Sequence, residues 1–429
     1  MSTDHRAATA WCLYDWANSA FATVVLSAVL PVYFAAIAPV GGIFLAGRTI
    51  PATAFWSYTV AISMLLVAVV APALGNLADR HAVKKPLLIF FTTLGAAATA
   101  LLVLADRGDY LLAAGLFLAG NVGFAAGNIF YNAFLPDLAS GEEADRLSSK
   151  AYALGYLGGG VALALVFLLI EGHAWFHITG KGIATRLGFL LTGAWWLLFA
   201  LPAFRWLQEA PPHPDAHRLH TPADYLRLAR QLAGYPDLLR FLCAYLLYND
   251  GIQTIIAVAA IFASVELGLS TGTILGCYLM IQFLAMPATM LTARLAACWG
   301  AKRTVMGTLA LFALITVYAA TMRSSLEFWL LGAGVALVLG GSQALSRSLY
   351  AGLVPPRRSA EFFSFFAISS KFASILGPLV FALLIDLTGS NRLAIFSLAA
   401  FFVAGMLLLT GVDIERGRQR AGEHLSATT

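Results

Sequence analysis

Two long apolar runs on either side of a short polar break constrain this chain more than any other feature. The runs cover roughly residues 53–74 and 87–105, and the break extends from Gly75 to Pro86. About 20 apolar residues in a helix span the ~30 Å hydrocarbon core of a bilayer, so each run is long enough to cross a membrane. The whole chain is 60% hydrophobic and 11% charged, against ~25% charged residues in ordinary soluble domains. The sequence therefore predicts an all-α protein that crosses a membrane many times.

The spacing of the apolar runs predicts twelve transmembrane helices. A charged turn is expected at residues 136–149 and a hydrophilic linker at 208–237. The chain then divides into a first six-helix half (1–207), the linker, a second six-helix half (238–412) and a tail (413–429). The predicted helices are 11–36, 53–76, 86–105, 109–134, 150–171, 185–207, 238–264, 272–292, 304–321, 326–350, 364–386 and 392–411.

The polar break has a second, weaker copy at residues 293–303. A shift of 218 residues places Leu77 on Leu295, whereas Asp79 falls on Ala297. A repeat of about half the chain indicates two homologous halves. Because six helices return the chain to the side on which it began, the two halves are predicted to be parallel repeats.

The distribution of basic residues predicts which side of the membrane each loop occupies. With twelve helices, 20 of the Lys and Arg residues lie on the side of the N-terminus and six on the other side. Cytoplasmic loops carry the excess of Lys and Arg. Both termini, the polar break and the linker are therefore predicted to be cytoplasmic, and a bacterial inner membrane is the expected location. This count treats Arg347 as a charge at the cytoplasmic end of its helix.

The polar break reads G-x-L-A-D-R-x-x-x-K-K over residues 75–85, and together with twelve helices in two parallel repeats it resembles the major facilitator superfamily. Four further segments resemble the vacuole-effluxer-like branch, which is related to fungal autophagy-linked exporters of vacuolar amino acids. They are YDWANSAF at 14–21, YNAFLP at 131–136, LYNDG at 247–251 and SRS at 346–348.

This resemblance implies a transporter fold with a central cavity between two halves, and amino acids among the candidate solutes. One departure affects the mechanism. Many proton-coupled members carry an arginine in the fourth helix, but residues 109–135 hold no basic side chain. The usual proton switch of the superfamily therefore does not transfer to this chain.

The polar break supplies a group of candidate gating residues, which are Gly75, Asp79, Arg80, Lys84 and Lys85. Asp79 is predicted to receive a positive partner, either a helix N-terminus or a nearby arginine, where the two halves meet on the cytoplasmic side.

Polar side chains inside the seventh predicted helix form the strongest candidate solute or ion site. A charged side chain near the bilayer centre costs ~3 kcal/mol or more, so it must be paired or lie in a wet cavity. Asp250 lies about ten residues, or ~15 Å, beyond Arg240. Its polar neighbours are Tyr248, Asn249 and Gln253. They form either a structural hydrogen-bonding cluster or part of a proton or solute site, and burial should raise the pKa of an aspartate there.

The first and fourth predicted helices contribute further candidates. Asp15 and Asn18 lie in the cytoplasmic part of the first helix, and Asp15 could also simply reach water. Asn121, Asn128 and Asn132 recur at i, i+7 and i+11 in the fourth, which places three amides on one helix face. Such a face suits the wall of a polar cavity.

Lys371 is the basic residue that falls inside the eleventh predicted helix. It either extends its ammonium toward the cytoplasm or faces the central cavity. In the second case Lys371 and Asp250 would together hold a zwitterionic solute, the lysine binding its carboxylate.

These features predict a secondary active transporter that moves a small polar solute by alternating access, coupled to a proton or another ion. The chain has no Gly-x-x-x-x-Gly-Lys-Ser/Thr loop for ATP, no His-Glu-x-x-His metal pattern and no nucleophile–base pair of an enzyme. Neither cofactor, metal nor nucleic acid is expected; the expected partners are the solute and the lipid bilayer. A drug or sugar-like exporter and a non-transporting sensor or scaffold remain the alternatives.

Overall fold

Helices make up nearly all of the described chain. The computed structural model describes residues 5–39, 42–45, 48–50, 52–209, 232–355, 358–372, 376–388 and 390–426. The first set of elements is α1 (His5–Ala20), the π-helix η1 (Phe21–Ala28), α2 (Leu30–Ile37), β1 (Ile43–Leu45), β2 (Arg48–Ile50), α3 (Ala52–His81), α4 (Lys84–Leu101), the 3-10 helix η2 (Leu102–Leu104), α5 (Tyr110–Ala133), α6 (Leu135–Leu138), α7 (Gly141–Glu171) and α8 (Lys181–Trp206). The second set is α10 (Pro236–Val265), α11 (Thr271–Trp299), α12 (Ala301–Ala319), α13 (Ser325–Leu353), α14 (Ser359–Phe372), α15 (Leu376–Thr388), α16 (Asn391–Thr410) and α17 (Ile414–Ser426).

Each of the twelve predicted spans falls on helices of the structure. Within the described residues, nine unbroken helices are long and apolar enough to cross a membrane, and the first span becomes a tenth if its two arms are counted together. Those arms meet at 44°, next to the π-helical turns of η1 and to Pro31, which has no N–H to donate to the preceding turn. The seventh and eleventh predicted spans correspond to α10 and to α14 with α15.

Four details differ from the sequence-based expectation. The polar break predicted between the helices 53–76 and 86–105 is mostly helical, because α3 continues to His81 and α4 begins at Lys84. The charged turn predicted at 136–149 is mostly helical, because Glu142 and Glu143 lie in the first turn of α7, where carboxylates favour the helix N-terminus. Strands β1 and β2 pair antiparallel within an otherwise helical protein. The tail predicted after residue 412 contains α17. Most of the predicted linker 208–237 lies outside the described residues, which resume at 232.

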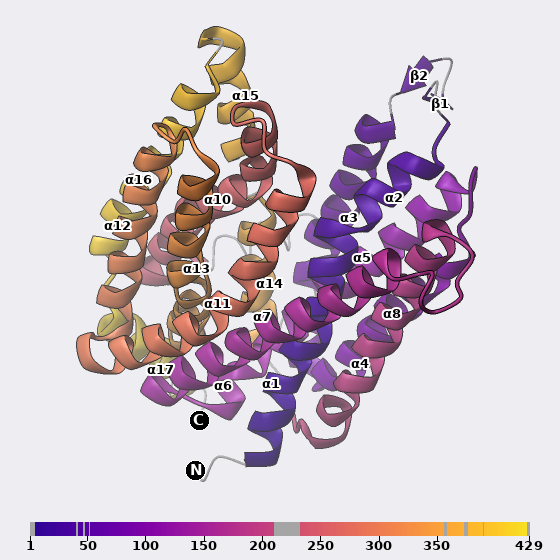
Figure 1. The fold of residues 1–429 in the computed structure, drawn as a ribbon. Helices are drawn as coiled ribbons and strands as arrows, with labels where there is room; N and C mark the ends of the chain where they lie inside the picture. Colours follow the sequence, from indigo (N-terminus) through magenta and orange to yellow (C-terminus); the bar gives the residue numbers. More distant parts are fainter. Residues whose placement is uncertain are drawn as a thin grey trace.

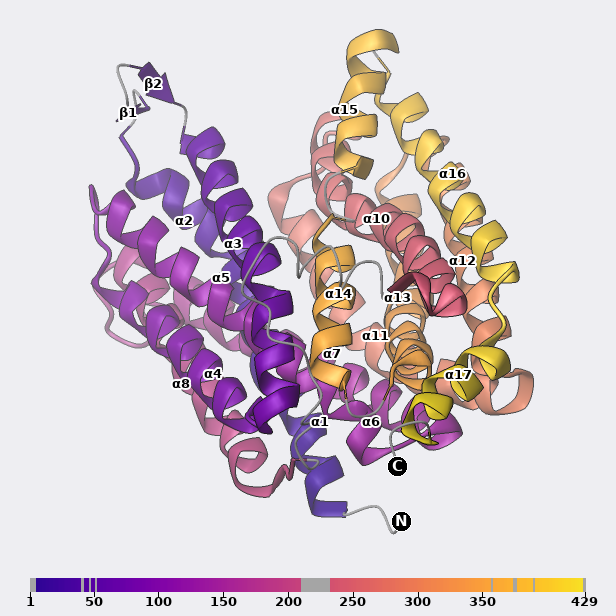
Figure 2. The same ribbon diagram turned by 180° about the vertical axis from the view of Figure 1, so that it is seen from behind.

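The helices gather into two groups that touch at one end. Elements α1 to α8 form the first helix group and α10 to α16 the second, and the two groups diverge away from the end where α1 begins (Figure 1). We call that end the terminal end, since α17 lies there too, and the opposite one, with β1 and β2, the far end (Figure 2). Contacts between the groups are made by α3 and α5 with α14, and by α7 with α11 and α13.

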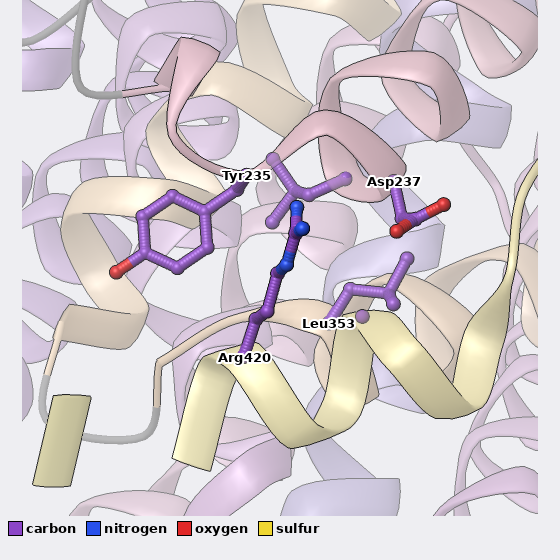
Figure 3. Close-up of a pocket in the computed structure, with 6 residues that line it drawn as sticks. Tyr235, Asp237, Leu353 and Arg420 are labelled. Carbon is purple, nitrogen blue, oxygen red and sulfur yellow. The ribbon is translucent and has the colours of Figure 1, made fainter. Parts of the chain in front are cut away.

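Helix α17 is fixed beneath the second helix group. Arg416 donates two hydrogen bonds to the carboxylate of Asp237, at 2.7 and 2.6 Å, and the backbone N–H of Asp413 donates a third at 3.0 Å. The side chains of Leu353, at the end of α13, and Arg420 lie between Asp237 and Tyr235 (Figure 3). Helix α17 thereby packs against α10 and α13 at the terminal end.

Candidate functional site

The polar break of residues 75–86 binds the start of α14, in the other helix group. The carboxylate of Asp79 accepts hydrogen bonds from the backbone N–H groups of Ala360, at 3.1 Å, and Glu361, at 2.8 Å. Both N–H groups belong to the first turn of α14, which begins at Ser359, and an anion there is stabilised by the helix dipole. The prediction that Asp79 meets a helix N-terminus where the two halves touch is confirmed. Its role in gating stays a prediction.

Gly75 permits this contact because it has no side chain. A β-carbon at Gly75 would lie 2.5 Å from the carbonyl oxygen of Ala360 and 2.8 Å from the Cα of Glu361. Both distances are shorter than real Cβ contacts, and the opposing atoms belong to backbone, which cannot swing aside. Gly75 and Asp79 are one helical turn apart in α3, so the same face of α3 supplies both the space and the acceptor.

Lys84 extends the contact along the same boundary. Its ammonium lies 2.8 Å from a carboxylate oxygen of Asp137, 2.9 Å from the hydroxyl of Ser359 and 4.0 Å from Asp79. The lysine is 3% exposed, so this charge is held by partners rather than by water. One buried lysine thus joins α4 and α6 of the first group to the start of α14 in the second.

Lys85 and Glu209 act within the first group. The Lys85 ammonium donates to the carbonyl of Leu207, just after α8, and Glu209 accepts from the backbone N–H groups of Lys84 and Lys85. Partial burial raises the pKa of Glu209, although the two amide donors oppose that shift. Arg80, the fifth candidate of the polar break, is half-buried.

Arg347 is a further buried charge at the boundary between the groups. The prediction that Arg347 is a helix-end charge is wrong, because its side chain is 2% exposed and α13 continues to Leu353. Its Nη1 lies 3.1 Å from Asp15 Oδ2 and 3.3 Å from Asn132 Oδ1. Its Nε and Nη2 each donate at 2.9 Å to Ser148, to the hydroxyl and the backbone carbonyl respectively.

Aromatic rings of the first group enclose the same guanidinium. Its central carbon lies 4.2 Å from the ring centre of Tyr152, 4.6 Å from Trp11 and 5.5 Å from Tyr131. Guanidinium groups at such distances from ring faces gain cation–π attraction, which strengthens when water is excluded. The Tyr131 hydroxyl adds a long hydrogen bond at 3.5 Å.

The predicted candidates of the first and fourth spans come together in pairs. Asp15 and Asn132 meet through Arg347, as described above. Asn18 donates to the side-chain oxygen of Asn128 at 2.8 Å, which joins α1 to α5. Asn121 instead donates to Ser63 at 2.7 Å, so the third amide of the predicted stripe binds α3. The stripe therefore serves contacts between helices of the first group as well as the boundary with the second.

The candidates of the seventh predicted span lie on α10 and bind within the second group. Asp250 is fully buried and one carboxylate oxygen accepts a hydrogen bond of 2.8 Å from the N–H of Gly377, at the start of α15. Tyr248 shares a 2.6 Å hydrogen bond with Ser346. Asn249 is buried and Gln253 half-buried. Lys371 belongs to α14, but its side chain lies outside the described residues, so the expected pairing of Lys371 with Asp250 stays a prediction.

Sequence reasoning missed Arg347 as a member of the site, together with the rings around it. The available signal was the position of Arg347 three residues inside a predicted apolar helix, next to Ser346 and Ser348. Ser348 does bind across the boundary, since its hydroxyl donates to Asp145 of α7. The partners lie more than 190 residues away in sequence, so no local pattern could identify them.

The two helix groups, joined at one end, have the fold of the major facilitator superfamily, a class of membrane transporters. A crystal structure of the human organic anion transporter MFSD10 (TETRAN) has this fold: the two align with a TM-score of 0.74 over 95% of this chain and 100% of that one, at 17% identity. More particularly, the chain belongs to the vacuole effluxer Atg22-like family, whose pattern matches residues 3–422.

Two relatives cover most of the chain. It is 35% identical over 411 residues to the MFS-type transporter YxiO of Bacillus subtilis (strain 168), with 94% of each chain covered. It is 25% identical over 547 residues to autophagy-related protein 22 of Coccidioides immitis (strain RS), with 98% of this chain and 89% of that one covered. The predicted superfamily and branch are confirmed.

Proposed function

We propose that this protein is a secondary active transporter that moves a small polar solute, with amino acids as the leading candidates, by alternating access between its two helix groups. The supporting observation is that the groups meet at the terminal end through buried charged contacts. Asp79, Lys84 and Arg347 each bind the opposite group there. Contacts of this kind hold one closed state and can be exchanged for water or solute in another, as alternating access requires.

We further propose that the terminal end faces the cytoplasm, as the excess of basic residues on that side favours. The conformation described here would then be closed to the cytoplasm, in a bacterial inner membrane. In this conformation the polar break acts as a gate, because opening would separate Asp79 from the start of α14.

The deciding experiment is uptake of a labelled amino-acid panel into proteoliposomes, with and without a pH gradient. Accumulation of one or more amino acids above the level in empty vesicles is the expected result. Sugars and hydrophobic amines in the same panel test the other transport functions. Exclusive uptake of one of those would exclude amino acids as the solute, and failure to move any solute would remove the transport proposal itself.

Asp250 is the proposed proton carrier. Its carboxylate is fully buried and accepts a hydrogen bond from the neutral N–H of Gly377. Protonation of Asp250 would therefore remove a buried negative charge that is costly in free energy. Asp250→Asn should abolish accumulation driven by a pH gradient, a loss of at least tenfold, while exchange of internal for external solute continues. If gradient-driven accumulation survives in this variant, the proton is carried elsewhere, and Asp15 is the next residue to substitute.

A further inference from the structure

We propose that the first helix group carries a binding site for an organic cationic group, a primary ammonium or a guanidinium, and that Arg347 fills this site in the conformation described here. The site consists of the Asp15 carboxylate, the two Ser148 oxygens, the Asn132 side-chain oxygen and the rings of Trp11, Tyr131 and Tyr152. The proposal that Arg347 leaves it during the cycle rests on the proposed transport function.

The chemistry of the site is that of a cation receptor. Each contact recorded for the guanidinium within the described part of the chain is with an oxygen or a ring face, and the carboxylate of Asp15 lies 3.1 Å from Nη1. A guanidinium has five N–H donors and no acceptor, so an all-acceptor wall suits it, and a primary ammonium has three such donors. Rings and a carboxylate together are also the usual surroundings of bound organic cations.

Contacts inside the first group hold the walls of the site in place. The indole N–H of Trp11 donates to the backbone carbonyl of Tyr131 at 2.8 Å, and the two rings stack with centres 4.6 Å apart. Tyr14 also stacks on Tyr131, with 4.8 Å between the two ring centres, and the Tyr14 hydroxyl shares a hydrogen bond with the hydroxyl of Thr92. None of these contacts involves Arg347. The receptor is therefore expected to keep its shape when the arginine is withdrawn.

Arg347 itself belongs to the other group. It stands on α13, while its hydrogen-bond partners stand on α1, α5 and α7. When the groups separate at the terminal end, all of these contacts break together. Asp15 has no other ion pair among the described residues, so its carboxylate would then face the opening without a counter-charge. A partly buried carboxylate without a partner is costly, and a cationic group on the solute lowers that cost.

Arg347 and a solute cation thus compete for one site. While the arginine is seated, the terminal end is closed; when the end opens, a solute can place its own cationic group against Asp15 and the rings. The ammonium of an amino acid is such a group. This competition predicts an unusual result, which is that removal of the arginine strengthens cation binding instead of weakening it.

The test uses methylguanidinium chloride as the probe and N-methylurea, a neutral molecule of nearly the same shape, as its control. In detergent, the melting temperature of Arg347→Ala should rise with methylguanidinium at millimolar concentration and saturate, and it should not respond to N-methylurea. The parent protein should need at least tenfold more methylguanidinium for the same rise, because its own arginine competes. Arg347→Ala combined with Asp15→Asn should lose the response.

Equal responses of the single and double variants, or equal responses to both probes, would overturn the site. If Arg347→Ala does not fold, Arg347→Gln retains most of the side-chain volume, and equilibrium binding of radiolabelled methylguanidinium to Arg347→Gln and to the parent replaces the melting measurement, with the same tenfold difference expected. These binding assays need no transport. If amino acids are transported but the binding responses are absent, the site is refuted and the proposed function stands. If the binding responses are present but no solute is transported, only the proposed function is refuted.

Discussion

The polar break at residues 75–86 and its copy at 293–303 have the same place in the two repeats but make different contacts. In both, a lysine binds carbonyl groups just after the last long helix of its own group. Lys85 binds Leu207 after α8, and Lys302 binds Thr410 and Val412 around the end of α16. Within the described residues, the hydrogen bonds of this motif that cross the boundary come from the first copy, through Asp79 and Lys84 to the start of α14.

The difference follows from two substitutions. Gly75 and Asp79 correspond to Ala293 and Ala297, so the copy has neither the space for a facing backbone nor the acceptor for helix N–H groups. Ala297 is exposed, whereas Asp79 is 3% exposed. The contact inside each group is therefore common to both repeats and the contact between groups is not. Within the described residues, closure by this motif is carried by one repeat.

The largest effect is expected from Gly75→Val, because a β-carbon there collides with the backbone of α14. Overpacking of this kind costs about 1–3 kcal/mol, so the population of the closed conformation should fall up to about a hundredfold relative to the open one.

Spin labels at Ser140 and Gly422, which line a cavity of 160 Å³ between α7 and α17, report the separation of the groups. The exposed Cys243 and Cys298 are first replaced by serine. Ala293→Val is the matched control and should leave the label distance unchanged; an unchanged distance in Gly75→Val itself would contradict the steric account.

Asp79→Asn should have a smaller effect of the same kind. The amide can still accept one hydrogen bond from Ala360 or Glu361, but it has no charge for the helix N-terminus or for Lys84. A loss of about 1.4 kcal/mol, or tenfold in the closed-to-open ratio, is expected, with expression intact. The same label pair measures it, and Ala297→Asn serves as the control at the copy. If the distance distribution matches that of the parent, Asp79 does not hold the closed state.

The smallest effect should come from Lys85→Ala and Lys302→Ala. Each removes hydrogen bonds from an ammonium to carbonyl groups inside one group, a contribution of about 1 kcal/mol to stability at positions partly open to water. Both variants should lower the melting temperature in detergent by similar, small amounts and leave the label distance as it is. A change of distance in either variant would show that the in-group contacts also set the balance between conformations.

Local patterns were sufficient for much of the architecture and for part of the site. Apolar run lengths located the helices, and Asp79 in the polar break was expected to bind either a helix N-terminus or an arginine, of which the structure shows the first. The boundaries of α7 were less predictable, since Glu142 and Glu143 read as loop residues although carboxylates also favour a first helical turn. Arg347 was wrongly predicted as a helix-end charge because it lies three residues from the end of its predicted helix. Its burial depends instead on contacts with α1, α5 and α7, which the sequence of one helix does not reveal.

The sequence by itself determined that this chain is a helical membrane protein built from two repeats, because the hydrocarbon core of a bilayer imposes a length and an apolar composition on each segment. It also determined that Asp79 and Asp250 are charges that need partners, whereas Arg347 was assigned to a helix end. Only the tertiary structure decided which partners those are: a helix start for Asp79, the N–H of Gly377 for Asp250, and the carboxylate and rings of the opposite group for Arg347. The physical reason is that the cost of burying a charge is a property of one residue, whereas the contact that offsets it depends on how distant segments pack.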